Sequence, residues 1–259
     1  SKKGLGKMYL LSLDTAAKTA AACVSNLDEN GALKPLARVA VNATLTHSES
    51  LLPMIDFCLE NARLSFSDIS ILAASTGPGS FTGVRIGIAT AKGLAFARPE
   101  LICIGVSTLE ALAYNISAFP SGRVLLPVMD ARRNQFYHAF FRSSGNDVKR
   151  LSDDALLTYD EIVKDAMARF PKKKFVLIGD GAELFYKLYT EQPIPGFDVT
   201  LCGAEALYED AFSVARCAAK IYRKDAYRTP QNYTSAVFDP VYLRASQAER
   251  ERAAKEGAQ

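Results

Sequence analysis

A strand pattern that occurs twice is the feature that most constrains the fold of this chain. The apolar runs at residues 9–13 and 123–129 each end at an acidic residue, Asp14 and Asp130. After a short turn, each run is followed by a second strand-like run, and then by segments with helical and strand periodicity. Such a pattern predicts an α/β unit that has been duplicated, with a cleft between the two copies.

Domain boundaries follow from the places where this pattern restarts. We expect a first lobe at residues 8–106 and a second lobe at residues 107–244, with Met8 as the natural start of the chain. A late helix at residues 210–223 has an apolar stripe that would allow it to pack back on the first lobe. Residues 245–259 are polar with mixed charges, so we expect a tail of frayed helix or disorder.

Composition excludes several classes of protein. The 259 residues are 49% hydrophobic and 23% charged, which is typical of a globular protein with a real core. The net charge of +3 neither demands nor excludes nucleic acid. The five cysteines are widely spaced without a Cys-x-x-Cys pair, which favours a reducing cytoplasm over a disulfide framework or a zinc site. No apolar run is long enough for a membrane helix, so no membrane association is expected.

The most specific motif is a glycine-rich stretch at residues 76–94, which reads Thr-Gly-Pro-Gly-Ser-Phe-Thr-Gly-Val-Arg-Ile-Gly-Ile-Ala-Thr-Ala-Lys-Gly-Leu. Together with residues 11–15 and 128–133, this stretch resembles the TsaB family, also called YeaZ. Weaker similarity around His47 and at residues 240–244 extends the match over nearly the whole chain.

This resemblance implies a fold and a function. The fold is α/β, with two ribonuclease H-like lobes of the actin, sugar kinase and Hsp70 (ASKHA) superfamily. TsaB is similar in fold to TsaD, which transfers the threonylcarbamoyl group, and pairs with TsaD in a complex that includes the ATPase TsaE. The product is t6A at adenosine 37 of tRNAs that read ANN codons. A protein of this kind is a cytoplasmic, non-catalytic partner subunit and forms a homodimer when alone.

A metal site is not supported by the histidines. Only His47 and His138 occur in the chain, and the position four residues after His47 is Leu51. TsaD-like proteins hold their metal through a His-x-x-x-His pair, which places two imidazoles on one helix face. The motifs therefore support neither a metallopeptidase nor the glycoprotease label that such chains take from TsaD.

A nucleotide site has weak support. In ATPases of this superfamily, a glycine in each lobe's first hairpin lets the backbone approach phosphate, but alanine or arginine stands there in this chain. The turn around Asp180 resembles an adenosine-side glycine turn, although we favour an ordinary connection between a strand and a helix. The weak candidates for nucleotide binding are Asp14, Thr15, Asp130, Arg132, Gly179 and Gly181.

We therefore expect no cofactor to be required by the isolated chain, although a weakly bound nucleotide at an interface shared with a partner stays open. A stand-alone ATPase or metallopeptidase is the alternative function. A ribonuclease H-type nuclease ranks last, because no further acidic residues accompany Asp14 and Asp130. The loop at residues 77–83 lacks the lysine of a phosphate-binding P-loop, so we favour a structural turn there over an anion site.

A stripe of small residues marks the helix after this loop. Gly83, Gly87, Ala91 and Ala95 recur every four residues, which allows another element to approach closely. That element is either the protein's own sheet or a helix of a partner, and the family resemblance favours the partner. The predicted interface with a TsaD-like protein, or with a second copy of the chain, comprises Leu51, Leu52, Ile55, Gly83, Gly87 and Ala91.

Nucleic-acid binding has little support in the sequence. The basic clusters at residues 172–174 and 132–133 are short, and lysines before a strand are usually solvated edge residues. Any contact with tRNA is therefore expected to be auxiliary.

Overall fold

The computed structural model describes residues 7–42, 47–117, 122–225 and 234–244. Its first half is built on a five-stranded sheet with the order β3-β2-β1-β4-β5, in which β1 to β3 are antiparallel and β4 and β5 run parallel to β1. These strands are β1 (Met8–Asp14), β2 (Ala20–Leu27), β3 (Leu33–Val41), β4 (Ile69–Gly77) and β5 (Ile102–Ser107). Helices α1 (His47–Ala62) and α2 (Phe81–Ala97) cover one face, with a 3-10 turn at Phe66–Asp68 between α1 and β4.

The second half repeats this arrangement around a seven-stranded sheet. Its main path has the order β10-β7-β6-β11-β12, with an antiparallel neighbour on one side of β6 and the parallel strand β11 on the other. The strands are β6 (Val124–Asp130), β7 (Gln135–His138), β8 (Phe141–Ser144), β9 (Asp147–Arg150), β10 (Ala155–Thr158), β11 (Lys174–Ile178) and β12 (Asp198–Leu201). The helices of this half are α4 (Tyr159–Arg169) and α5 (Ala182–Glu191). The shared strand order confirms the predicted fold class of two ribonuclease H-like lobes.

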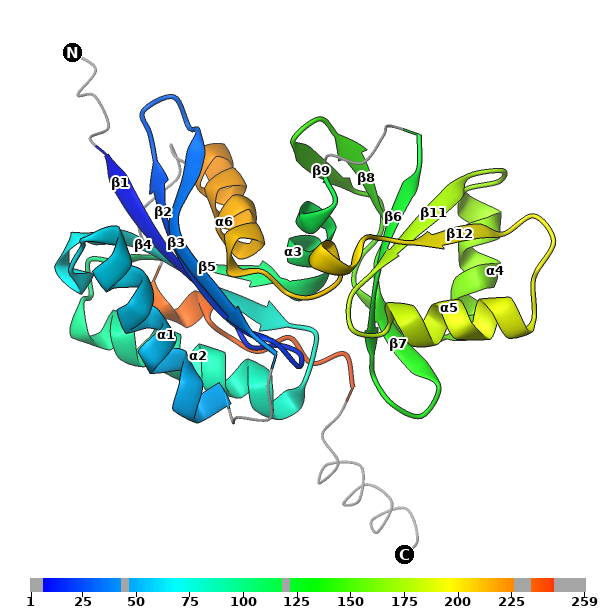
Figure 1. The fold of residues 1–259 in the computed structure, drawn as a ribbon, viewed down its shortest axis with the longest axis horizontal. Coiled ribbons are helices and arrows are strands. Elements are labelled where there is room, and N and C mark those ends of the chain that lie inside the picture. The colour runs from blue at the N-terminus through cyan, green and yellow to red at the C-terminus, as the bar shows by residue number, and fades with distance from the viewer. Residues whose placement is uncertain (1–6, 43–46, 118–121, 226–233, 245–259) are drawn as a thin grey trace, which may run out of the picture.

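Two further helices lie between the sheets (Figure 1). Helix α6 (Ala211–Asp225) packs across β1 to β5, on the face opposite α1 and α2, and α3 (Thr108–Asn115) packs against α6, β6 and β9. The expected boundary between residues 106 and 107 thus falls at the end of β5, and α3 contacts both lobes. The remaining short elements are 3-10 turns at Ala204–Ala206 and Ser235–Val237. No helix in the described ranges is long and apolar enough to cross a membrane.

Local sequence signals account for several helix starts. The Ser80 hydroxyl accepts a hydrogen bond from the Gly83 N–H at the start of α2, and Thr158 and Glu161 form a capping box at the start of α4. The Ser107 hydroxyl accepts a hydrogen bond from the Glu110 N–H at the start of α3. The predicted tail at residues 245–259 lies outside the described residues.

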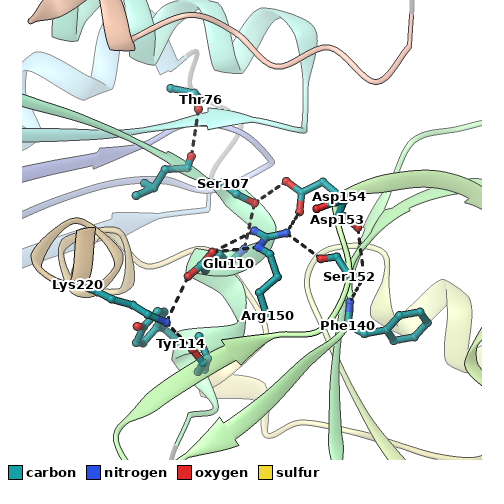
Figure 2. Close-up of polar contacts among 12 residues, drawn as sticks. Thr76, Ser107, Glu110, Tyr114, Phe140, Arg150, Ser152, Asp153, Asp154 and Lys220 are labelled. Carbon is teal, nitrogen blue, oxygen red and sulfur yellow. Dashed lines mark hydrogen bonds and ion pairs between the residues drawn. The ribbon is translucent and has the colours of Figure 1, made fainter. Parts of the chain in front are cut away.

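An ion-pair network links α3, α6 and β9 (Figure 2). Arg150 of β9 pairs with Glu110 of α3 at 3.1 Å and with Asp154 at 2.5 Å, and the Ser107 hydroxyl donates to Asp154 at 2.7 Å. Lys220 of α6 reaches the same Glu110 at 3.7 Å. The network therefore joins the helix that lies on the first sheet to strands of the second.

We expect Arg150→Met to lower the free energy of unfolding by about 2 kcal/mol, because it leaves the largely buried Asp154 without a cation and Glu110 with only the more distant Lys220. Urea denaturation measures the difference. Arg169→Met is the matched control, since it breaks the exposed Arg169–Asp165 pair and should change stability by at most about 0.5 kcal/mol. Equal effects of the two substitutions would show that the network contributes no more than a surface ion pair.

Candidate functional site

The first hairpin carries a buried carboxyl group at the end of β1. Asp14 is 1% exposed, and its Oδ1 accepts a hydrogen bond from the Ala16 N–H at 2.9 Å. Its Oδ2 is buried and has no hydrogen-bond partner in the described structure. Burial raises the pKa of Asp14 to about 6, and the Ala16 hydrogen bond offsets part of the rise.

Glu209 is a second buried acid, and it was not among the residues predicted from the sequence. It lies in the segment before α6, and both of its carboxylate oxygens are buried without a partner in the described structure. Burial is the main cause that raises its pKa well above the usual value, and the charges of Asp14 and Asp180 raise it further. Three acids from β1, the β11–α5 turn and the start of α6 therefore interact. Between Tyr208 and Asp210, Glu209 has no sequence signal that distinguishes it from a solvated residue.

Glu209 also lines a cavity of about 330 Å³. Thr19, whose hydroxyl is buried without a hydrogen-bond partner in the described structure, lies on the same wall. Within the described part of the chain, no three His, Cys, Asp or Glu side chains are grouped so that they could hold a metal ion.

The second hairpin, between β6 and β7, is arranged differently from the first. The Asp130 Oδ1 accepts a hydrogen bond from the Arg132 N–H at 2.7 Å, and its Oδ2 lies 3.5 Å from the Arg132 guanidinium. Arg132, Arg133 and Asn134 all have positive φ values, of 64°, 58° and 58°. Non-glycine residues rarely adopt this left-handed conformation, so the turn is strained.

The C-terminal motif at residues 240–244 supports this strained turn. The Val241 N–H donates to the Thr76 carbonyl at 2.8 Å, which holds the segment against the first sheet. The Arg244 guanidinium then donates to the Ala131 carbonyl at 2.6 Å and to the Gln135 side chain. The end of the described chain thus ties the first lobe to the hairpin of the second.

The glycines of the β11–α5 turn are required by the packing of the turn on β6. A Cβ atom at Gly179 would lie 2.4 Å from the Val128 carbonyl oxygen, and one at Gly181 would lie 2.7 Å from the Asp130 nitrogen. Between these glycines, Asp180 accepts a hydrogen bond from the Asp130 N–H at 3.2 Å, and burial raises the pKa of its carboxyl group. The turn joins β11 to α5.

Thr15, another of the weak nucleotide candidates, has its hydroxyl engaged within the protein. It is 1% exposed, and its hydroxyl donates to the Gly83 carbonyl of α2 at 2.7 Å. The two histidines lie in different environments. The Nε2 of His47 lies 2.8 Å from the Ala17 carbonyl oxygen, whereas His138 is packed inside the second lobe, where burial lowers its pKa to about 4.

The small-residue stripe of α2 faces the protein itself, so most of the predicted partner interface is wrong. Gly83, Gly87 and Ala91 are buried, and Leu51 and Ile55 of α1 are only 1% and 2% exposed. A Cβ atom at Gly83 would lie 2.1 Å from the Thr15 carbonyl oxygen, and one at Gly87 would lie 2.5 Å from the Thr15 hydroxyl. The glycines allow α2 to approach the β1–β2 turn, and the apolar stripe of α1 covers β2 and β3.

The outward sides of the same two helices carry large exposed apolar residues among polar ones. Leu52, the one residue of the predicted interface that points outward, is 52% exposed, Phe57 is 50% exposed, and Phe96 is 88% exposed. Gly93, ten residues after Gly83 on α2, has open space where a Cβ atom would lie. We call these four residues on the outward sides of α1 and α2 (Leu52, Phe57, Gly93 and Phe96) the outer helix face. Large apolar side chains left exposed can mark an interaction surface.

The whole chain has informative relatives. Residues 40–252 match the model of the family described as "TsaD: tRNA N6-adenosine threonylcarbamoyltransferase". The "tRNA threonylcarbamoyladenosine biosynthesis protein TsaB" of Escherichia coli K12 is 30% identical over 251 residues, which cover 96% of this chain and 100% of that protein. The protein of the same name from Haemophilus influenzae is 28% identical, covering 92% of this chain and 94% of that protein.

Solved structures agree on the fold. A Pseudomonas aeruginosa protein described as having similarity to the peptidase YEAZ superposes with a TM-score of 0.71 at 23% identity, covering 92% of this chain and 100% of that one. A second structure, YeaZ from the same organism, has a TM-score of 0.68 at 24% identity, covering 91% of this chain and 100% of that one.

Proposed function

This chain belongs to the TsaB (YeaZ) family, and from that membership we propose that it is a non-catalytic partner subunit of a TsaD-like threonylcarbamoyltransferase. The proposed complex also contains a TsaE-like ATPase and acts in the cytoplasm. Its product is t6A at adenosine 37 of tRNAs that read ANN codons. The outer helix face is the observation on which the proposed partnership rests.

The chemistry of the cleft supports a non-catalytic role. Phosphate-binding hairpins need a close backbone approach, and here the β6–β7 turn carries arginine side chains in a strained conformation. Magnesium sites use ionised carboxylates, and burial raises the pKa of both Asp14 and Glu209, which makes it costly to ionise the two groups together.

The outer helix face suits a partner that has the same fold. Because the TsaD family model matches most of this chain, a TsaD-like protein has helices equivalent to α1 and α2. Two such helix pairs can meet about a pseudo-twofold axis, with each pair burying the apolar face of the other. The same geometry allows two copies of this chain to form a homodimer when the partner is absent.

We expect Phe96→Glu to weaken binding to the TsaD-like partner at least tenfold, because it places a charge in the centre of an apolar contact. Leu184→Glu is the matched control, since Leu184 is also an exposed apolar residue (41%) but lies on α5 of the second lobe. Calorimetry with the purified partner measures the affinity, and a tRNA modification assay measures the consequence. If Phe96→Glu remains folded and binds as tightly as Leu184→Glu, the partner docks elsewhere.

A stand-alone ATPase or metallopeptidase remains the alternative function. Its discriminating property is metal-dependent turnover by the purified chain without any partner. A nucleotide held weakly at the interface with the TsaD-like protein is compatible with the proposed role. Such a nucleotide would bind to the complex and not to the isolated chain, which distinguishes this case from a stand-alone enzyme.

A further inference from the structure

A groove of about 830 Å³ lies between the lobes, at a place that the proposed function does not use. Its walls are the turn between β2 and β3, helix α3, the β8–β9 hairpin and helix α6. Figure 1 shows α6 between the first sheet and this hairpin. The groove shares no residue with the group of Asp14, Asp180 and Glu209, nor with the outer helix face.

Positive charge dominates the lining of this groove. Arg216, Lys220, Arg223 and Lys224 all come from α6, and the spacing of these residues places them on one side of the helix. The only acidic residue among the described lining residues is Asp147 of β9. We call this set of four cations and one carboxylate the basic groove.

One of the four cations is neutralised within the protein. The Lys220 ammonium lies 3.1 Å from Asp147 and 3.7 Å from Glu110, as part of the network that joins the lobes (Figure 2). Asp147 is occupied further by the Tyr114 hydroxyl, which donates to it, and by the Val148 N–H at 2.8 Å. The one carboxylate of the basic groove, Asp147, is therefore paired with Lys220.

The other three cations contact only neutral groups in the described residues. The Arg216 guanidinium donates to the Tyr114 carbonyl at 2.7 Å, the Ser117 hydroxyl at 2.8 Å and the Asn146 carbonyl. Arg223 donates to the carbonyls of Ala219 and Gly31, each at 3.0 Å. Lys224 is exposed and forms no hydrogen bond or ion pair with the described residues.

Arg216 is half-buried, and among the described residues no carboxylate contacts its guanidinium directly. Burial disfavours the charged form and is the main cause that lowers the pKa of Arg216, although nearby groups, Asp147 and Asp210 among them, offset part of this effect. An anion in the groove would add a direct counter-charge and contact Arg223 and Lys224 at the same time. The groove is therefore preorganised for a negatively charged ligand.

The extent of the charge indicates a polyanion. Residues 216 to 224 span about 12 Å along a helix, which is longer than one phosphate group. Phe212 forms part of the same wall and offers an aromatic surface beside the cations.

We propose that the basic groove binds the phosphodiester backbone of RNA, and that it thereby holds the tRNA of the complex proposed above. The identity of the RNA as tRNA rests on the proposed function. The contact between phosphate groups and the basic groove rests on the positive charges of Arg216, Arg223 and Lys224. Backbone contacts of this kind are independent of sequence and position the RNA without reading its bases. The groove thus extends the role of the chain from docking a partner to docking the substrate.

The test is binding of an in vitro transcribed tRNA that reads an ANN codon, measured by fluorescence anisotropy with the full chain across a range of salt concentrations. We expect Arg223→Gln/Lys224→Gln to weaken binding about tenfold at low salt. The slope of log Kd against log salt should fall by about 0.7 to 0.9 for each phosphate group that the variant no longer neutralises. Lys224→Gln alone removes no interaction among the described residues and should produce part of both effects.

The matched control is Lys172→Gln/Lys173→Gln, which removes the same charge from the exposed turn before β11. It should bind like the wild-type chain. The inference is overturned if the chain does not bind tRNA at low salt, if the groove variant binds with unchanged affinity and slope, or if the control weakens binding equally. Calorimetry with the TsaD-like partner is a separate measurement, so loss of tRNA binding with an intact partner affinity would not bear on the proposed partnership.

Discussion

Gly83→Ala is expected to lower the free energy of unfolding by about 3 kcal/mol, although alanine is the better helix former. The added Cβ atom would lie 2.1 Å from the Thr15 carbonyl oxygen, which is main chain and cannot rotate away. Either α2 or the β1–β2 turn must move, and the hydrogen bond from Thr15 to the Gly83 carbonyl is strained with it. Overpacking of this kind exceeds the gain of up to about 1 kcal/mol in helix propensity.

The same helix provides the control for this substitution. Gly93 lies on the outer helix face with nothing near the position of a Cβ atom, so Gly93→Ala should raise the free energy of unfolding by up to about 1 kcal/mol. Urea denaturation of both variants measures the two changes against wild type. If Gly83→Ala is as stable as Gly93→Ala, the stripe is not packed against the first hairpin and is again a candidate for the partner contact.

Asp14→Asn is expected to stabilise the protein by about 2 to 3 kcal/mol at pH 8 and to leave its stability unchanged at pH 4. Asp14 has a pKa of about 6 in the folded protein and an ordinary value of 3.8, so the folded state binds the proton more tightly. The tighter proton binding by folded Asp14 stabilises the protein fully below pH 3.8. This stabilisation is lost as the pH rises through 6, because the buried carboxyl group must then ionise. The difference between the pKa of Asp14 in the folded protein, about 6, and its ordinary value of 3.8 corresponds to roughly 3 kcal/mol of free energy of unfolding.

Asparagine removes this cost and keeps the useful contact. Its side-chain oxygen can still accept the hydrogen bond from the Ala16 N–H, while the amide cannot ionise. Urea midpoints at pH 4, 6 and 8 measure the pH dependence, and the exposed Asp56→Asn serves as a control that should change stability by less than about 0.5 kcal/mol throughout. A difference between Asp14→Asn and wild type that is equal at pH 4 and pH 8 would mean that the pKa of Asp14 is not raised in the folded protein.

The sequence alone was sufficient for the architecture. The apolar runs that end at Asp14 and Asp130 are strands β1 and β6, and each is the central strand of its sheet. The small residues that recur every four positions after the loop at residues 77–83 also predicted a helix, which is α2, because burial on one side of an element leaves a repeating pattern in the chain. The specific motif at residues 76–94 was enough to identify the family.

Whether the regularly spaced residues of a helix face the protein's own core or its surface was decided by the tertiary structure. The stripe with Gly83 and Gly87 shows that something approaches α2 closely, but periodicity does not tell whether that element is the turn at Thr15 or a second protein. Phe57 and Phe96 carry the outer helix face, yet isolated apolar residues on a polar side of a helix give no periodic signal.

Contacts between distant segments were equally inaccessible to sequence reasoning. Glu209 becomes a buried acid only because the start of α6 meets Asp14 and Asp180, which are far from it in the chain. The Arg216 guanidinium contacts carbonyl and hydroxyl oxygens, and no carboxylate of the described residues, because the end of α3 and the β8–β9 hairpin present those oxygens to it. Sequence patterns thus determine which elements form and which faces they bury. The environment of a charged group depends on what the fold brings against it, and that is a property of the tertiary structure alone.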